Sequence, residues 1–281
     1  MDPAFFQSPV YLSLALACLA LGALSGLMAG LLGIGGGLIL VPGLLWLLPQ
    51  VGVPAATAMP SALASSLAAI VLTAVASTRA HAQRGAVQWP LVRRLAPAVA
   101  VAAVLAGTVA AQLGSRWLTL LFALFAITLA LRTVRVSMVS ATRTPPPAWA
   151  WPGWGAGIGL LSGLVGIGGG SLTVPLLLHY GVPITQAVAT SAAVGLPIAA
   201  FGTLGYVVAG WQAGSATTMP PGATGFVYWP AVLAITLASW FTAPVGARLA
   251  HRWPAARLRR LFAVFLAVVG ARLLVKALFA L

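Results

Sequence analysis

The residues best suited to chemistry are glycines, because the same five-residue sequence occurs twice in an otherwise apolar chain. GIGGG stands at residues 33–37, within LLGIGGGLILVP, and again at residues 166–170, within LVGIGGGSLTVP. Glycine adopts positive φ and lets a ligand approach the backbone closely, so each stretch predicts a break between two helical arms. The second arm then begins with free N–H groups and the positive end of its dipole, which together favour a bound anion.

The candidate anion-binding residues are therefore the glycines of both breaks and the hydroxyls near them. Ser171 directly follows the second break, whereas Leu38 follows the first, so we expect an asymmetric site. Hydroxyls early in the helix after each break are also suited to donate to an oxyanion. The predicted substrate-binding residues are Gly33, Gly35, Gly36, Gly37, Gly166, Gly168, Gly169, Gly170, Ser171, Ser61, Thr190 and Ser191.

Each of these residues also has a purely structural interpretation. Glycines let membrane helices pack closely, and Ser or Thr hydroxyls bond to carbonyl groups of their own helix or a neighbouring one. For a single GIGGG, packing is the better interpretation. The repetition, the short arms and the Val-Pro pair that follows each copy favour a ligand path.

A few ionisable residues could act beside the glycines. Arg79 and Arg84 follow the first post-break helix and form a predicted cytoplasmic vestibule for an anion, although a role in setting topology alone would explain them equally well. His81, His179 and His251 stand apart without Cys, Asp or Glu, so we expect no metal site and no cofactor and interpret them as interfacial residues.

Composition decides what kind of protein must position these residues. Of the 281 residues, 61% are hydrophobic and 6% are charged, which indicates an all-α polytopic membrane protein. The formal net charge of +14 does not indicate nucleic-acid binding, because Arg and Lys stand at the ends of apolar segments rather than on one basic face. Asp2 is the only acidic residue, which excludes a carboxylate relay within the membrane.

The chain reads as two diverged copies of one unit, because a Val-Pro and a Gly-Val-Pro sequence recur at nearly the offset of the glycine breaks. Repeat one is predicted at 1–140, with a glycine-broken hairpin at about 9–50 and helices at about 53–77, 95–113 and 117–136. A linker is predicted at 141–152. Repeat two is predicted at 153–281, with a hairpin at about 155–180 and helices at about 183–209, 227–249 and 258–281.

The glycine arms of the second copy, 155–165 and 171–180, are each about 15 Å long, half of a hydrocarbon core. They predict a hairpin that enters the membrane and returns, so each copy crosses three times and the copies are inverted. The basic residues on one side are then Arg79, Arg84, Arg93, Arg94, Arg132, Arg135, Arg143, Arg248, Arg252, Arg257, Arg259 and Arg260, with Arg116, Arg272 and Lys276 opposite.

Four crossings per copy would divide the same charges nine to six, so inverted repeats with both ends outside fit the positive-inside rule better. The first arm, residues 9–32, is long enough to span the membrane alone, and the side of the N-terminus therefore stays open.

Two pairs of sequences, GLLGIGGGLILVP with TAMPSALASS and GLVGIGGGSLTVP with VATSAAVG, resemble the duplicated signature of the TauE/SafE family, the sulfite-exporter group. The resemblance covers nearly the whole chain. It implies transport of small sulfur-containing anions, such as sulfite, sulfoacetate or related organosulfonates, usually outward across the bacterial inner membrane. Copy one departs from the pattern, because Pro60-Ser61 stands where family members often have Thr-Ser.

The leading hypothesis is an anion transporter that works by alternating access around a midplane site formed by both breaks. Its partners would be the small anion and the lipid bilayer, without nucleic acid. The alternatives are a non-transporting membrane scaffold and a permease for a different small anion. An enzyme is not expected, because the sequence offers no catalytic nucleophile, metal set or acid pair.

Overall fold

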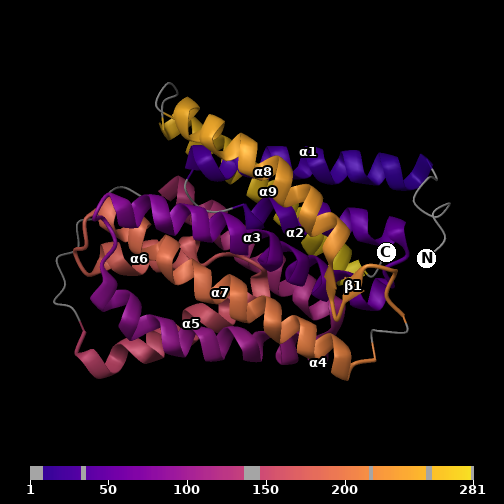
Figure 1. The fold of residues 1–281 in the computed structure, drawn as a ribbon, viewed down its shortest axis with the longest axis horizontal. Helices are drawn as coiled ribbons and strands as arrows, with labels where there is room; N and C mark the ends of the chain where they lie inside the picture. Colours follow the sequence, from indigo (N-terminus) through magenta and orange to yellow (C-terminus); the bar gives the residue numbers. More distant parts are fainter. Residues whose placement is uncertain (1–8, 33–35, 136–145, 215–217, 251–254, 280–281) are drawn as a thin grey trace.

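The computed structural model describes residues 9–32, 36–135, 146–214, 218–250 and 255–279, and most of these are helical. Six of the described helices are long and apolar enough to cross a membrane, which confirms an all-α polytopic membrane protein. The long helices run side by side in Figure 1. They are α1 (Pro9–Leu32), α3 (Ala58–Gln83), α4 (Trp89–Arg135), α7 (Ile184–Gln212), α8 (Trp229–Ala250) and α9 (Ala255–Phe279).

Shorter elements fill the space between the long helices. The short helices are α2 (Gly37–Leu47), α5 (Trp151–Val165) and α6 (Gly170–His179), with single 3-10 turns η2 (Leu48–Val51), η3 (Ala55–Thr57) and η4 (Ala148–Ala150). Strands β1 (Ala223–Thr224) and β2 (Val227–Tyr228) form a small antiparallel hairpin between α7 and α8.

α4 consists of two helices in one continuous run. Gly114 has φ 70° and ψ 167°, a backbone conformation that only glycine adopts readily, and it separates a helix before it from a helix after it. The helices predicted at 95–113 and 117–136 lie on either side of this residue. Each half of α4 is long enough to cross most of a bilayer core.

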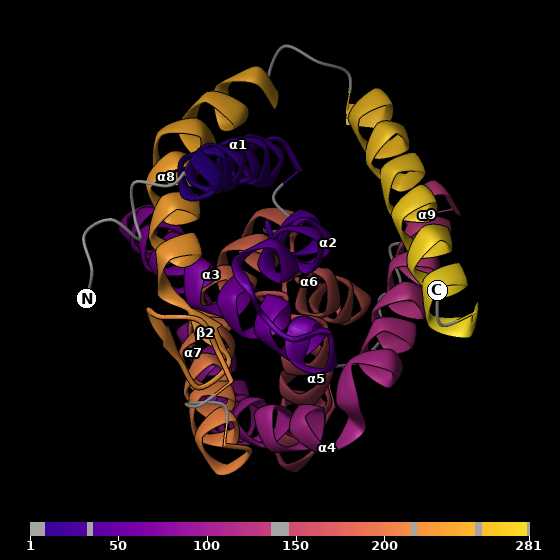
Figure 2. The same ribbon diagram turned by 90° about the vertical axis from the view of Figure 1, so that its right-hand side faces the viewer.

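Helices from the first half of the chain pack against helices from the second half. α1 packs along α8, and α5 packs along α4. The short arms α2 and α6 lie near the centre in Figure 2, where α2 contacts α3 and α6 contacts α7. α3 and α7 also pack against each other, so the two helices that follow the glycine breaks are joined in the interior.

Glycines at every fourth position let α5 approach α4, and α1 approach α8, at short backbone distances. Gly155, Gly159 and Gly163 face α4 from α5, and a Cβ added at any of them would press on α4. Gly22 and Gly26 of α1 stand against α8 in the same way. Each row stands in the helix that precedes a glycine break. One glycine-rich helix therefore packs closely along its length and is interrupted at its end.

Equivalent helices of the two copies run antiparallel where they touch. Ser61, near the start of α3, contacts Met219 beyond the end of α7, with 3.8 Å between the hydroxyl oxygen and the sulfur. Gln88, just beyond α3, donates its backbone N–H to Thr190 near the start of α7. Arg116, at the start of the second half of α4, donates to a carbonyl oxygen near the end of α9.

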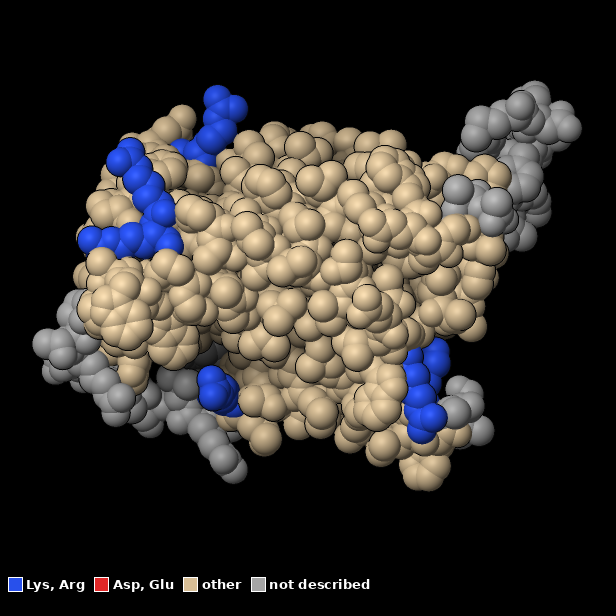
Figure 3. All heavy atoms as spheres, turned by 90° about the horizontal axis from the view of Figure 1, so that it is seen from below, with Lys and Arg blue, Asp and Glu red and all other residues tan. Residues whose placement is uncertain are grey.

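The outer surface suits lipid along its middle. Large apolar side chains such as Leu105, Leu233 and Phe241 are more than half exposed on the outer helices. On the face drawn in Figure 3, Lys and Arg gather toward the two ends of the molecule and leave a broad uncharged band between them. Apolar residues that would be unfavourable in water are therefore expected to contact acyl chains.

The glycine row of α5 gives a direct test of the packing of α5 along α4. We expect Gly159→Leu to lower the free energy of unfolding by about 1 to 3 kcal/mol, because its side chain would meet the backbone of α4 at Val99. Gly157→Leu is the matched control, since an added Cβ there meets nothing within 4 Å. Thermal unfolding of the purified variants in detergent measures the difference. Equal stability of the two would contradict this packing.

Candidate functional site

The two glycine breaks lie against each other in the centre of the molecule. A Cβ added at Gly37, the first residue of α2, would lie 2.6 Å from the carbonyl oxygen of Gly166 and 3.0 Å from Cα of Ile167. It would also lie 3.1 Å from the side chain of Ile70 on α3. Segments 130 residues apart in sequence thus meet at backbone distance, which only glycine permits here.

Hydroxyl groups hold the carbonyl oxygens around the breaks. The Ser66 hydroxyl, fully buried on α3, donates to the Gly166 carbonyl oxygen at 2.9 Å. The Tyr206 hydroxyl on α7 donates to the Gly163 carbonyl oxygen at 3.1 Å, and the Ser25 hydroxyl donates to Gly36 at 3.3 Å. The Gly36 and Gly163 carbonyl oxygens also accept backbone N–H groups, whereas the Gly166 carbonyl oxygen has the Ser66 hydroxyl as its one partner among the described residues. An unpaired carbonyl away from water would be costly, so the Ser66 bond lets the backbone leave its helix inside the protein.

Left-handed glycines end one arm of the second break and begin the other. Gly166 has φ 71° at the end of α5, and Gly169 has φ 76° immediately before α6. Within the part of the chain that the structure describes, the backbone N–H groups of residues 168–171 donate to no carbonyl oxygen. The start of α6 therefore presents unused donors together with the positive end of a helix dipole.

A cavity of about 460 Å³ connects the breaks to one end of α3, which is a volume typical of small-molecule sites. Its wall is made mostly of glycines, alanines and hydroxyl-bearing residues. The residues that line it are Ser25, Gly26, Ala29, Gly30, Gly36, Leu40, Ala69, Ile70, Thr73, Ala74, Ser77, His81, Arg84, Gly168, Gly170, Val188, Ser191, Ala192, Gly195, Ser239 and Ala243.

The cavity brings together five of the residues singled out from the sequence. Gly36 of the first break, Gly168 and Gly170 of the second, and Ser191 of α7 share its wall, and Arg84 lies where the wall reaches the exposed end of α3. Because Asp2 is the only acidic residue of the chain, no carboxylate lines this cavity among the described residues.

Other predicted glycines pack instead of lining the cavity. Gly37 and Gly166 touch the opposite break as described above, and Gly169 abuts Ile198 of α7. Gly33 and Gly35 lie outside the described residues.

The remaining predicted side chains do not line the cavity either. Ser61 contacts Met219, and the Thr190 hydroxyl accepts the Gln88 backbone N–H at 3.0 Å. Ser171 is buried in the first turn of α6, and Arg79 is exposed outside the cavity lining.

Several lining residues were not predicted. Ser25, Thr73, Ser77 and Ser239 add hydroxyls to the wall, and His81, interpreted as interfacial, also lines the cavity. Four lining residues of α3 and then Arg84, just beyond the helix, are spaced three or four residues apart. They are Ala69, Thr73, Ser77, His81 and Arg84. The sequence pattern that could have predicted these lining residues is therefore a stripe of small and polar residues along one face of α3.

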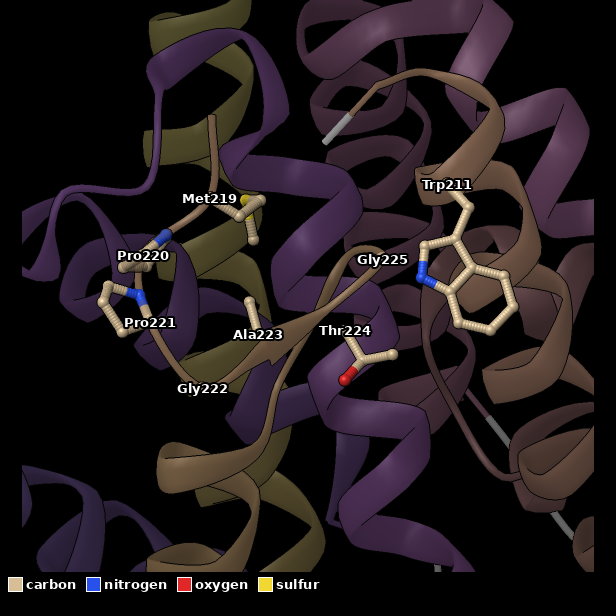
Figure 4. A pocket seen from close by; sticks show the side chains of 8 residues that line it. All are labelled: Trp211, Met219, Pro220, Pro221, Gly222, Ala223, Thr224 and Gly225. Atoms are coloured by element: carbon tan, nitrogen blue, oxygen red, sulfur yellow. The ribbon is translucent and has the colours of Figure 1, made fainter. Parts of the chain in front are cut away.

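A second hollow of about 330 Å³ lies at the other end of α7 (Figure 4). It is formed by Trp211 and the loop Met219–Gly225. The same loop covers the start of α3, where the backbone N–H of Tyr228 donates to the buried Ser65 hydroxyl at 3.0 Å. Ser61 and Ser65 are thereby closed off at this end, whereas Ser191 faces the central cavity.

Six candidate spans with broken short helices around a small, carboxylate-free cavity define a membrane transport protein. The family model for Sulfite exporter TauE/SafE matches residues 18–273, so the chain belongs to the TauE/SafE family and is a multi-pass membrane transporter. It is 38% identical over 231 residues to a probable membrane transporter protein of Haemophilus influenzae, covering 81% of this chain and 86% of the relative.

A probable membrane transporter protein of Methanocaldococcus jannaschii is 27% identical over 187 residues, covering 65% of this chain and 68% of that protein. No solved structure matches the chain. Membership of this transporter family implies a small-molecule substrate and a lipid bilayer as surroundings.

Removing the Ser66 hydroxyl tests how the second break is held. We expect Ser66→Ala to lower the free energy of unfolding by about 1 to 3 kcal/mol, because it leaves the buried Gly166 carbonyl oxygen without a partner. Thr128→Ala is the control, since that exposed hydroxyl bonds only within its own helix, to Leu124. Thermal unfolding compares the two. A Ser66→Ala protein as stable as the control would show that the break does not need this bond.

Proposed function

We propose that the protein transports small sulfur-containing anions, such as sulfite or an organosulfonate, across the bacterial inner membrane. The observation that carries this proposal is the central cavity, because both glycine breaks contribute to one wall. The family description as a sulfite exporter supports the substrate class and an outward direction.

Electrostatics of the cavity favour an anion over a cation as the transported molecule. The unused N–H groups at the start of α6 and the dipole of that helix stabilise negative charge beside Gly168 and Gly170. The guanidinium of Arg84 attracts anions to the mouth of the cavity. With no carboxylate in the wall, nothing there repels a sulfonate or sulfite group.

Hydroxyl groups in the cavity wall would orient the bound anion. Ser191 and Ser77 line the cavity from two different helices, and each hydroxyl can donate one hydrogen bond to an oxyanion. An anion with three oxygens on one sulfur could be held from several sides by such donors together with backbone N–H groups. Small neighbouring residues, mainly Gly and Ala, leave room for the anion between the helices.

Alternating access of the two copies is the mechanism we propose. The cavity extends toward Arg84 at one end of α3, and the loop around Met219 covers the other end. Antiparallel packing of α3 and α7 supports an inverted relation between the copies, in which a rocking movement would close one end and open the other. The midplane site would be exposed to each side in turn.

The direct test is flux of sulfite in liposomes that contain the purified protein. We expect sulfite efflux to exceed that of empty liposomes, and thiosulfate, sulfoacetate and chloride to show whether sulfur oxyanions are selected. Protein that inserts correctly but moves none of these anions would contradict the proposal and favour a scaffold.

Equivalent serines in the two copies test the position of the site. We expect Ser191→Ala to raise the KM for sulfite about tenfold, because it removes a hydrogen bond to a charged group. Ser61→Ala should have a smaller effect, since Ser61 contacts Met219 rather than the cavity. The measurement is concentration-dependent flux into liposomes. A larger effect at Ser61 would place the binding site at the other end of α3.

Substitutions of two arginines near the end of α3 test whether these residues attract the anion or only set the membrane topology. We expect Arg84→Gln to raise the KM about two- to fivefold at low ionic strength and less at high salt, because Arg84 lines the cavity mouth. Arg79→Gln removes the same charge from outside the cavity lining and should change the KM little. Equal effects of both substitutions would assign the arginines to general surface charge.

A further inference from the structure

Three buried hydroxyls at the second glycine break lack a hydrogen-bond partner. Ser162 and Thr173 are fully buried, Ser171 is 8% exposed, and none of the three hydroxyls bonds to any atom in the described part of the chain. Three other side-chain atoms share this property, at Thr78, Trp151 and Thr236. Buried polar groups are nearly always paired, so three unpaired hydroxyls gathered at one break are suited to hold a ligand.

The hydroxyls of Ser162 and Thr173 converge from opposite arms of the hairpin. They lie 3.7 and 3.6 Å from the point that a Cβ of Gly169 would occupy. Neither residue lines the central cavity, although Gly168 and Gly170 on either side of Gly169 do. The break therefore has two faces, with the cavity on one and the hydroxyl pair on the other.

The carbonyl end of α5 lets the second face hold positive charge, although Ser171 and Thr173 stand in the first turn of α6, whose dipole acts in the opposite sense. α5 ends here, and its dipole places partial negative charge on its last carbonyl oxygens. Those of Leu164 and Val165 accept no hydrogen bond from any residue that the structure describes. Uncharged oxygens from hydroxyls and from an unwound helix end are the ligands that transporters use for Na⁺. A divalent ion would require carboxylates, which this part of the chain lacks.

We propose that the second glycine break binds a sodium ion through the hydroxyls of Ser162 and Thr173, with Ser171 beside them, and through the carbonyl oxygens at the end of α5. The ion and the transported anion would then occupy opposite faces of the same glycines. Their attraction across this short distance makes each bind more tightly in the presence of the other, by the same factor. This coupling rests on the proposed function, whereas the cation site does not.

Thermal stability of the purified protein tests the cation site first. At constant ionic strength in NaCl, KCl or choline chloride, we expect Na⁺ alone to raise the unfolding temperature, by about 3 to 6 °C at tenfold its dissociation constant. A response that is equal for all three salts would overturn the proposal and would leave the hydroxyls to an ordinary buried water molecule.

Substitution of the proposed ligand hydroxyls tests where the sodium ion binds. The double variant Ser162→Ala with Thr173→Val should weaken Na⁺ binding about tenfold or more, read as the Na⁺ concentration that gives half of the stabilisation. Thr203→Val is the matched control, since the Thr203 hydroxyl on α7 already bonds to the Ala199 carbonyl oxygen at 2.6 Å. If the double variant responds to Na⁺ as the wild type does, the ion binds elsewhere and the proposal is wrong.

Adding sulfite separates this proposal from the proposed function. Stabilisation by sulfite that is greater in NaCl than in choline chloride supports both the ion and its coupling to the anion. Equal stabilisation by sulfite in both salts would support anion binding and overturn the coupling. Stabilisation by Na⁺ without any response to sulfite or other sulfur oxyanions would support the cation site and contradict the proposed substrate class.

Discussion

The need to pair every backbone polar group away from water is the constraint on which this structure depends. A helix that stops at mid-depth leaves carbonyl and N–H groups that lipid cannot satisfy, so the surrounding protein must supply the partners. Ser66 does this for the Gly166 carbonyl oxygen, and the Tyr206 and Ser25 hydroxyls add donors to the Gly163 and Gly36 carbonyl oxygens, which also accept backbone N–H groups. The helices that carry these side chains must therefore pass directly beside the breaks.

Close glycine packing brings the breaks to that position. The row Gly155, Gly159 and Gly163 fixes α5 against α4, and Gly22 with Gly26 fixes α1 against α8, so each broken arm is held by the other copy. The two breaks then meet in the interior, and the space left between small residues is the cavity. Some glycines of each half therefore pack against a neighbouring helix, and others, at the breaks, line the cavity.

The sequence was sufficient to predict the membrane class, the family and several cavity residues, because hydropathy and a duplicated motif depend little on three-dimensional detail. It could not distinguish Ser61 from Ser191, which occupy equivalent places in the two copies. Their surroundings differ because residues 218–228, in the connection between α7 and α8, cover the start of α3, whereas only residues 84–88 join α3 to α4. The role of His81 in the cavity wall likewise depended on how α3 is rotated toward the breaks.

The proposed function requires that an oxyanion binds between the two glycine breaks. Crystals grown with selenite, an analogue of sulfite whose selenium scatters anomalously, would locate the anion directly. We expect an anomalous peak inside the cavity, near Gly36, Gly168 and Ser191, at selenite concentrations that also inhibit sulfite flux. Peaks confined to surface arginines, with an empty cavity at saturating selenite, would contradict it.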